Sequence, residues 1–122
     1  MTRAATKDML QAVSFRLGKE EYALEITQVK EVIMPAGIMR MPQTAAFNVG
    51  VINLRGSIIP VIDLRLRLGV GEATTDDHTR ILIAKPGGRV VGLVVDAVSQ
   101  VMKVPRDEVV PPPPTIVGAA RR

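Results

Sequence analysis

The sequence predicts a mainly β fold, an all-β barrel or a pair of small barrels in which helices serve only as connectors. Short apolar runs with a period of two recur along the chain, and turn-forming residues separate them at nearly regular spacing. The apolar residues are mostly Val, Ile, Leu, Ala and Met, and aromatic residues make up only 2%, which favours strands. A chain of 122 residues is long enough for one compact domain.

The first predicted feature after a polar, flexible segment over residues 1–11 is a hairpin. Apolar and polar residues alternate over 13–17 and again over 22–26, and the polar residues 18–21 form a turn between them. The apolar residues of 29–33 are less regularly spaced and are followed by Pro35 and Gly37. We therefore expect a third strand with a bulge.

The middle of the chain predicts a short helix and a second hairpin. Residues 42–47 contain a proline, a Thr cap and two alanines, enough for one or two helical turns. Two β-rich runs over 51–54 and 58–62 then flank Arg55-Gly56-Ser57, a tight turn in which Gly56 can take a positive φ.

Residues 63–69 fit two structures. Their leucines alternate as in a strand, whereas Asp63 is a good cap and Gly69 a good stop for a short helix. A polar loop over 69–78 precedes a third hairpin formed by 81–84 and 90–95, and a further strand follows over 98–104. Residues 111–122 begin with four prolines, which cannot donate to a sheet, and we expect a tail or a truncated connection there.

The charges do not favour nucleic-acid binding or membrane insertion. The net charge is +4 and the pI is near 10.0, but the 16 basic residues are scattered among 12 acidic ones, with Arg65 and Arg67 the nearest to a patch. Only three aromatics are available as stacking platforms. Residues 1–11 lack the apolar run of a secretion signal and no stretch has the length of a membrane span, so we expect a cytoplasmic protein.

No residues predict catalysis, a cofactor or a metal site. The chain has no Cys, and its single His78 lies beside Asp76 and Asp77 in a polar loop, without the fixed geometry that a metal requires. The Gly87-Gly88 pair lies between two strands, whereas a phosphate loop begins a helix. Nothing in the sequence places two carboxylates together for acid–base work. We therefore expect a non-enzymatic protein.

The most informative segment is Gly50-Val-Ile-Asn-Leu-Arg-Gly-Ser-Ile-Ile-Pro-Val-Ile-Asp-Leu64. It resembles the signature of CheW domains, in which an Asn-Leu-Arg-Gly turn joins two strands and a Pro-Val-x-Asp-Leu run leads into a helix. Residues 15–18 and 22–24 are similar to the family's opening hairpin, and 91–98 to a late strand. The resemblance covers residues 13–120 and favours helix over 63–69.

The resemblance implies a CheW-like domain over residues 12–110, built from two small five-stranded barrels that share a core. It also implies a non-enzymatic adaptor that couples chemoreceptors (methyl-accepting chemotaxis proteins) to the histidine kinase CheA, without a cofactor. The partners would be the receptor's cytoplasmic tip and the regulatory domain of CheA, in the cytoplasm at membrane receptor arrays. By position, the partner-binding residues are Val29, Glu31, Val32, Gly50, Asn53, Leu54, Arg55, Gly56 and Val98.

Within this set, the resemblance implies a partly exposed ion pair between Glu31 and Arg55 that orients the arginine. Val29, Val32 and Val98 would form an apolar groove for one receptor helix, although a core role is equally compatible with each valine.

Family members normally continue beyond a Pro-rich segment with another strand pair and a terminal helix, whereas this chain stops at Arg122. We therefore expect an incomplete second barrel whose uncovered sheet edge leads to self-association, or a truncated variant. Other hypotheses are a coupling protein of a surface-motility pathway and a small-molecule enzyme or sensor.

Overall fold

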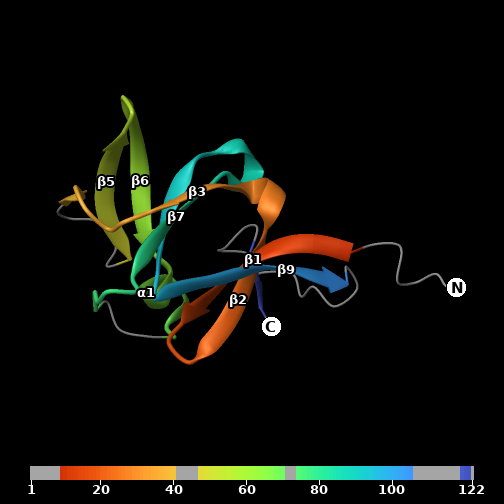
Figure 1. Ribbon diagram of the computed structural model, residues 1–122. Coiled ribbons are helices and arrows are strands. Elements are labelled where there is room, and N and C mark those ends of the chain that lie inside the picture. The colour runs from red at the N-terminus through yellow and green to blue at the C-terminus, as the bar shows by residue number, and fades with distance from the viewer. Residues whose placement is uncertain (1–8, 41–46, 71–73, 106–118, 122) are drawn as a thin grey trace, which may run out of the picture.

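The computed structural model describes residues 9–40, 47–70, 74–105 and 119–121, and most of them lie in strands. The strands form two sheets, one with the order β10-β2-β1-β9 and one with the order β3-β7-β8-β6-β5-β4 (Figure 1). The predicted mainly β class is therefore confirmed, and two sheets are consistent with two small barrels. The helix expected within 42–47 and the prolines of 111–114 lie outside the described residues, apart from Phe47.

The four-stranded sheet joins the two ends of the chain. Its strands are β1 (Met9–Leu17), β2 (Glu20–Glu25), β9 (Ala97–Pro105) and β10 (Ala119–Arg121). β1 pairs antiparallel with both β2 and β9, which confirms the predicted first hairpin. β1 begins within the segment expected to be flexible, and β10 lies within the expected tail, where it pairs with β2. Ile26, expected to end the second strand, instead begins the 3₁₀ turn η2 (Ile26–Gln28).

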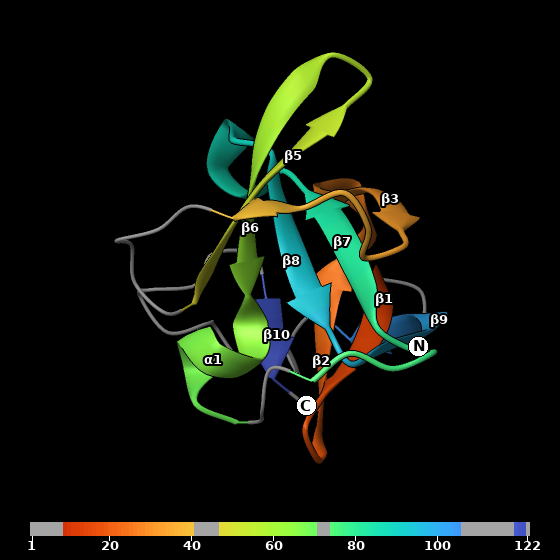
Figure 2. The same ribbon diagram turned by 90° about the vertical axis from the view of Figure 1, so that its left-hand side faces the viewer.

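The six-stranded sheet contains both of the other predicted hairpins (Figure 2). Its strands are β3 (Val29–Ile33), β4 (Met39–Arg40), β5 (Asn48–Leu54), β6 (Ser57–Asp63), β7 (Arg80–Ala84) and β8 (Val91–Val95). The bulge expected in the third strand is present, because the register of β3 against β7 shifts between Val29 and Glu31. A parallel pairing of β6 with β8 joins the β7–β8 hairpin to the β5–β6 hairpin within this sheet. This pairing was not predicted.

The ambiguous segment after β6 is the helix α1 (Leu64–Leu68). The Asp63 carboxylate accepts a hydrogen bond from the Arg65 backbone N–H, and Gly69 ends the helix with φ 68°. Both are the capping functions that the sequence suggested. The third hairpin turns through the 3₁₀ segment η3 (Pro86–Gly88).

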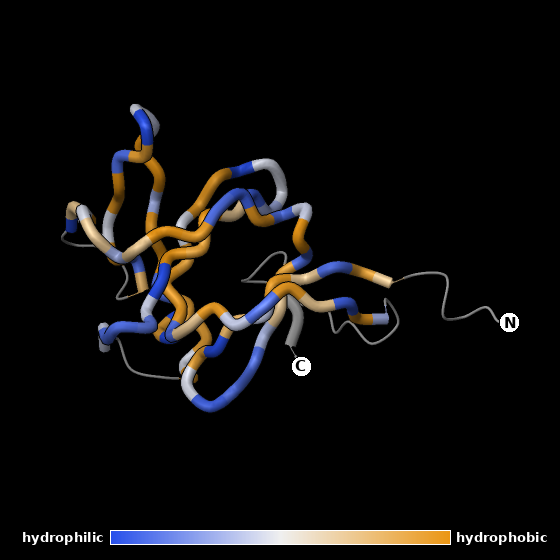
Figure 3. The backbone as a smooth tube through the Cα atoms, in the orientation of Figure 1, coloured by the Kyte–Doolittle hydropathy of each residue, from blue (hydrophilic) through white to orange (hydrophobic). Residues whose placement is uncertain are grey.

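Two hydrophobic clusters meet at β7, whose two faces are both buried. Leu82 and Ala84 point to a cluster that also contains β1, β2, β8 and α1 residues and therefore lies between the two sheets. Ile81 and Ile83 point to a second cluster, whose buried members all belong to the six-stranded sheet. The sheet therefore curls around this second cluster. Figure 3 shows hydrophobic residues mainly along the strands and hydrophilic residues mainly at the turns.

Candidate partner-binding surface

The central feature of the predicted surface is the contact between β3 and the turn of the β5–β6 hairpin. Arg55 Nη1 donates to Glu31 Oε1 at 3.4 Å, and Arg55 Nη2 forms a salt bridge with Glu31 Oε2. The Arg55 side chain is 70% exposed and the Glu31 side chain 28% exposed. The predicted partly exposed ion pair is therefore confirmed.

The pair changes the ionisation of both groups. The hydrogen bond from Arg55 is the largest cause that lowers the pKa of Glu31, and the charges of Arg55 and Lys30 lower it further. The same hydrogen bond raises the pKa of Arg55 above its usual range. Both groups stay ionised at neutral pH, so the surface presents a fixed guanidinium.

The turn that carries Arg55 has only two residues outside the strands, because Leu54 pairs with Ser57. Arg55 has φ 51° and Gly56 has φ 90°, the double positive φ of a type I′ turn. Among the described residues, Arg55 is the one non-glycine residue with positive φ. The Asn53 side-chain oxygen accepts a hydrogen bond from the Gly56 N–H at 2.9 Å, which fixes the turn.

The three predicted valines differ in burial. Val29 and Val98 are half-buried and pack against the cluster between the sheets. Val32 is 41% exposed and pairs with Leu82, which belongs to the same cluster. Val29 and Val32 therefore share one side of the β3–β7 ladder, whereas Val98 lies on β9 of the other sheet.

Two other predicted residues have structural functions. Gly50 is buried, has φ 154°, and a Cβ at this position would lie 2.0 Å from the Met39 carbonyl oxygen of β4. Only glycine allows this close approach of the two strands. Leu54 packs against the cluster inside the six-stranded sheet. A partner contact at either residue stays a prediction.

The most buried charged group was not recognised as a site in the sequence. Arg65 is 1% exposed; its Nε and Nη2 donate to the two Asp63 oxygens at 2.9 and 2.8 Å, and its Nη1 donates to Asp96 Oδ1 at 2.8 Å and to the Thr74 carbonyl. Asp63, followed by Asp96, raises the pKa of Arg65. The other Asp96 oxygen accepts from the Gly18 N–H at 2.6 Å.

This network bears on two points of the sequence analysis. Arg65 is not available for a basic surface patch with Arg67, whose guanidinium instead lies 4.6 Å from the centre of the Phe47 ring. The structure also brings two carboxylates to one arginine, which the sequence did not indicate. The available signal was that each Asp ends a buried β run, so its charge requires a partner.

The expected loop around His78 forms a local turn. The Asp76 carboxylate accepts from the His78 N–H at 2.7 Å, and this bond is the main cause that lowers the pKa of Asp76. No group of three potential metal ligands occurs within the described ranges. In the same part of the chain, none of the helices combines the length and the apolar character that crossing a bilayer requires.

Comparison with known proteins agrees with this architecture. Residues 11–121 match the CheW-like domain family. The chain is 40% identical to the probable chemotaxis protein CheW of Rhizobium etli, covering 92% of this chain and 72% of the relative. It is 32% identical to the chemotaxis protein CheW of Helicobacter pylori, covering 90% and 67%.

A solved structure gives the same result. The crystal structure of the scaffolding protein TtCheW from Thermoanaerobacter tengcongensis superimposes with a TM-score of 0.78 at 43% identity, covering 86% of this chain and 72% of that chain. The shared sequence signature, the two-sheet fold and the match over residues 11–121 lead to one conclusion: this chain belongs to the CheW-like domain family.

Proposed function

We propose that this protein is a non-enzymatic adaptor that couples chemoreceptors to the histidine kinase CheA in a bacterial signalling array. Its relatives are named chemotaxis protein CheW, and the solved relative is described as a scaffolding protein. The partners would be the cytoplasmic receptor tip and the CheA regulatory domain. The protein would then work in the cytoplasm, held at the membrane only through protein contacts.

The observation that carries this proposal is the exposed Glu31–Arg55 pair on a type I′ turn. A left-handed backbone costs a residue with a Cβ about 1–2 kcal/mol, and Asn would occupy the Arg55 position with less strain. Arginine is therefore not the residue that the turn itself favours. A guanidinium held by a carboxylate, with the exposed Val32 on the same strand as Glu31, suits recognition of another protein.

The experiment measures binding of this protein to the receptor tip and, in a separate assay, to the CheA regulatory domain. Arg55→Ala and Glu31→Ala should fold normally, because both side chains lie outside the hydrophobic clusters, and should bind the receptor tip about tenfold more weakly. Lys103→Ala, an exposed change on β9, is the control and should bind as the unchanged chain does. If Arg55→Ala and Glu31→Ala both bind the receptor tip as tightly as the unchanged chain does, the proposed binding surface is wrong.

A second candidate is the same coupling role in a related surface-motility pathway. The relatives include Protein FrzA of Myxococcus xanthus, 33% identical over 81% of this chain and 62% of the relative. Identification of the receptor that co-purifies with the protein from its own organism would separate the two pathways, since both predict the same binding surface.

A further inference from the structure

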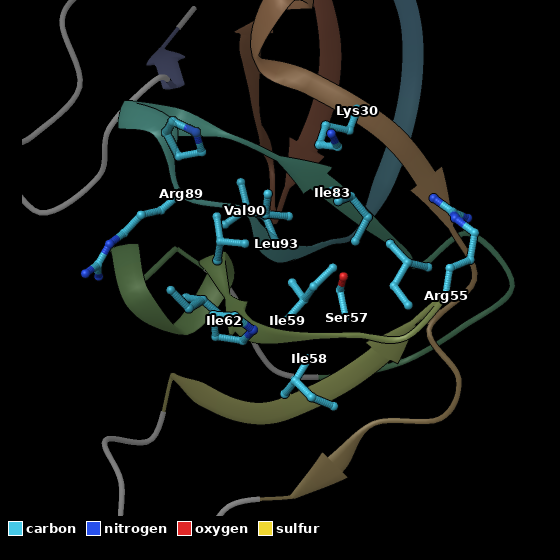
Figure 4. A pocket seen from close by; sticks show the side chains of 14 residues that line it. Lys30, Arg55, Ser57, Ile58, Ile59, Ile62, Ile83, Arg89, Val90 and Leu93 are labelled. Carbon is cyan, nitrogen blue, oxygen red and sulfur yellow. The ribbon is translucent and has the colours of Figure 1, made fainter.

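The proposed partner-binding surface takes its residues from both sheets. Glu31 lies on β3 and Arg55 in the β5–β6 turn, both parts of the six-stranded sheet. A cavity of about 860 Å³ beside the first half of β6 belongs to the same sheet, because all its lining residues lie in these strands or in the turns between them (Figure 4). Val98 lies on β9 of the four-stranded sheet. Its place relative to Arg55 therefore depends on how the two sheets are joined.

Asp96 is the residue at which the chain passes from one sheet to the other. β8 of the six-stranded sheet ends at Val95, and β9 of the four-stranded sheet begins at Ala97. Val98 follows two residues after Asp96 and is opposite Phe15 of β1, so it moves with the four-stranded sheet. The conformation at Asp96 therefore affects where Val98 lies relative to the six-stranded sheet.

Hydrogen bonds to both sheets hold Asp96. Its Oδ1 accepts from Arg65 Nη1 at 2.8 Å, and Arg65 belongs to α1 directly after β6. Its Oδ2 accepts from the Gly18 N–H at 2.6 Å, and its own N–H donates to the Arg16 carbonyl oxygen at 3.0 Å. Arg16 and Gly18 belong to the first hairpin of the four-stranded sheet. The Asp96 side chain is only 15% exposed, so water competes little for these bonds.

The charge of Arg65 alone does not account for Asp96. The two Asp63 oxygens already accept from Arg65 Nε and Nη2 at 2.9 and 2.8 Å, and one carboxylate neutralises one guanidinium. The feature specific to Asp96 is that its two oxygens accept from donors of different sheets. A carboxylate suits this arrangement because it is acceptor-only and can bind a donor with each oxygen.

We propose that Asp96 is a positioning residue for the partner-binding surface. By binding Arg65 with one oxygen and Gly18 with the other, it sets the angle between the sheets at which Val98 and the Glu31–Arg55 pair contact the same receptor tip. A surface that is arranged before binding loses less entropy when the partner docks. This role rests on the proposed adaptor function, and it does not require Asp96 itself to contact the receptor.

The test is a double-mutant cycle in which the full chain binds the receptor tip. Asp96→Asn keeps the size of the side chain but replaces one acceptor oxygen by a donor, so one of the two sheet contacts is lost. Asp96→Asn and Val98→Ala should each weaken binding about fivefold. The double variant should also lose only about fivefold, because a displaced Val98 has no contact left to lose. Arg55→Ala combined with Asp96→Asn should instead lose about fiftyfold, the product of two independent effects.

Asp77→Asn is the matched control, since it makes the same chemical change at an exposed residue of the turn around His78, and it should bind as the unchanged chain does. A residue that only stabilises the fold would lower the urea midpoint of Asp96→Asn and leave binding by the folded protein unchanged. If Asp96→Asn does not fold, Asp96→Glu replaces it in the cycle with the same expected results, because it keeps the charge but moves both oxygens by one methylene.

Four results would overturn the role of Asp96. They are undiminished binding by the Asp96 variant, a loss of about twenty-fivefold in its combination with Val98→Ala, as for independent residues, no effect of Val98→Ala alone, and equal weakening by Asp77→Asn. Arg55→Ala separates this failure from failure of the proposed function. If Arg55→Ala still weakens binding, only the role of Asp96 is wrong; if it does not, the proposed receptor surface is wrong as well.

Discussion

At the scale of single residues, the charge state of Glu31 depends on one neighbour. The pKa of Glu31 is below its usual value of 4.5 chiefly because Arg55 donates a hydrogen bond to it. A carboxyl group whose pKa is lower in the folded than in the unfolded chain stabilises the fold above its unfolded pKa, and this stabilisation is lost as the pH falls through its folded pKa. The pair therefore acts at neutral pH and weakens below about pH 4.5.

Arg55→Ala should raise the pKa of Glu31 toward 4.5, because the hydrogen bond and the nearby positive charge are both removed. An NMR titration of the side-chain carboxyl carbon measures this change directly. Asp76 is the internal control, since its lowered pKa has its main cause in the His78 N–H and should not move. An unchanged Glu31 pKa would mean that the pair does not form in solution.

Gly50→Ala should destabilise the protein by about 3 kcal/mol, because the added Cβ overlaps the Met39 carbonyl oxygen in a backbone conformation that L-residues rarely adopt. Urea denaturation measures the loss. Gly87→Ala provides the comparison: Gly87 also has positive φ, at 62°, but a Cβ there meets no atom within 4 Å, so about 1 kcal/mol is expected. Equal effects would show that the close approach of β4 and β5 has no energetic consequence.

At the scale of elements, different features of the β5–β6 hairpin determine its stability and its proposed binding. Its two-residue turn requires positive φ at both positions, which Asn-Gly satisfies with less strain than Arg-Gly. The turn therefore determines the shape of the hairpin, whereas the arginine supplies chemistry that the shape does not need.

Arg55→Asn should leave the free energy of unfolding unchanged or raise it by up to about 1 kcal/mol, through relief of backbone strain. The same variant should bind the receptor tip as weakly as Arg55→Ala. Urea denaturation and a binding isotherm on one preparation give both values. A variant that loses stability as well as binding would show that Arg55 is mainly a structural residue.

At the scale of the whole molecule, Arg65 joins parts that are distant in the sequence. Through Asp63 and Asp96 it connects the end of β6, the start of α1 and the segment between β8 and β9, and Asp96 in turn holds the Gly18 N–H of the first hairpin. These contacts cross from one sheet to the other. The network fixes how the two sheets lie relative to each other at this end of the molecule.

Arg65→Met should destabilise the protein by about 3–5 kcal/mol, because it leaves two carboxylates without their buried partner. Thermal or urea denaturation measures the loss. Arg67→Met is the matched control: it removes the contact with the Phe47 ring and should cost less than about 1 kcal/mol. Similar small losses in both variants would contradict the role of the network.

The outer edge of β9 belongs to the same scale, since β9 is the last strand of the four-stranded sheet among the described residues and Val101 on it is 53% exposed. Self-association through this edge predicts a concentration-dependent sedimentation coefficient. Val101→Lys should shift the equilibrium toward monomer, because a charge on an edge strand opposes pairing with another chain. A folded monomer at high concentration of the unchanged chain would argue against self-association.

The sequence alone determined most of the strands, the three hairpins and the central turn, because these depend on local alternation and turn residues. It did not predict the short strands β4 and β10. The segment over residues 63–69 also carried both of its helix caps, Asp63 and Gly69. The resemblance of residues 50–64 then supplied the pairing of Glu31 with Arg55, which no local pattern contains, and the structure confirmed it.

Only the tertiary structure decided the features that depend on pairing between distant segments. The parallel alignment of β6 with β8, the burial of both faces of β7 and the cavity beside the first half of β6 arise where segments far apart in the chain meet. The same is true of Arg65, which looks like a surface charge in the sequence and becomes a buried link between two carboxylates. Alternation shows which face of a strand is apolar, but it does not show which neighbour covers that face.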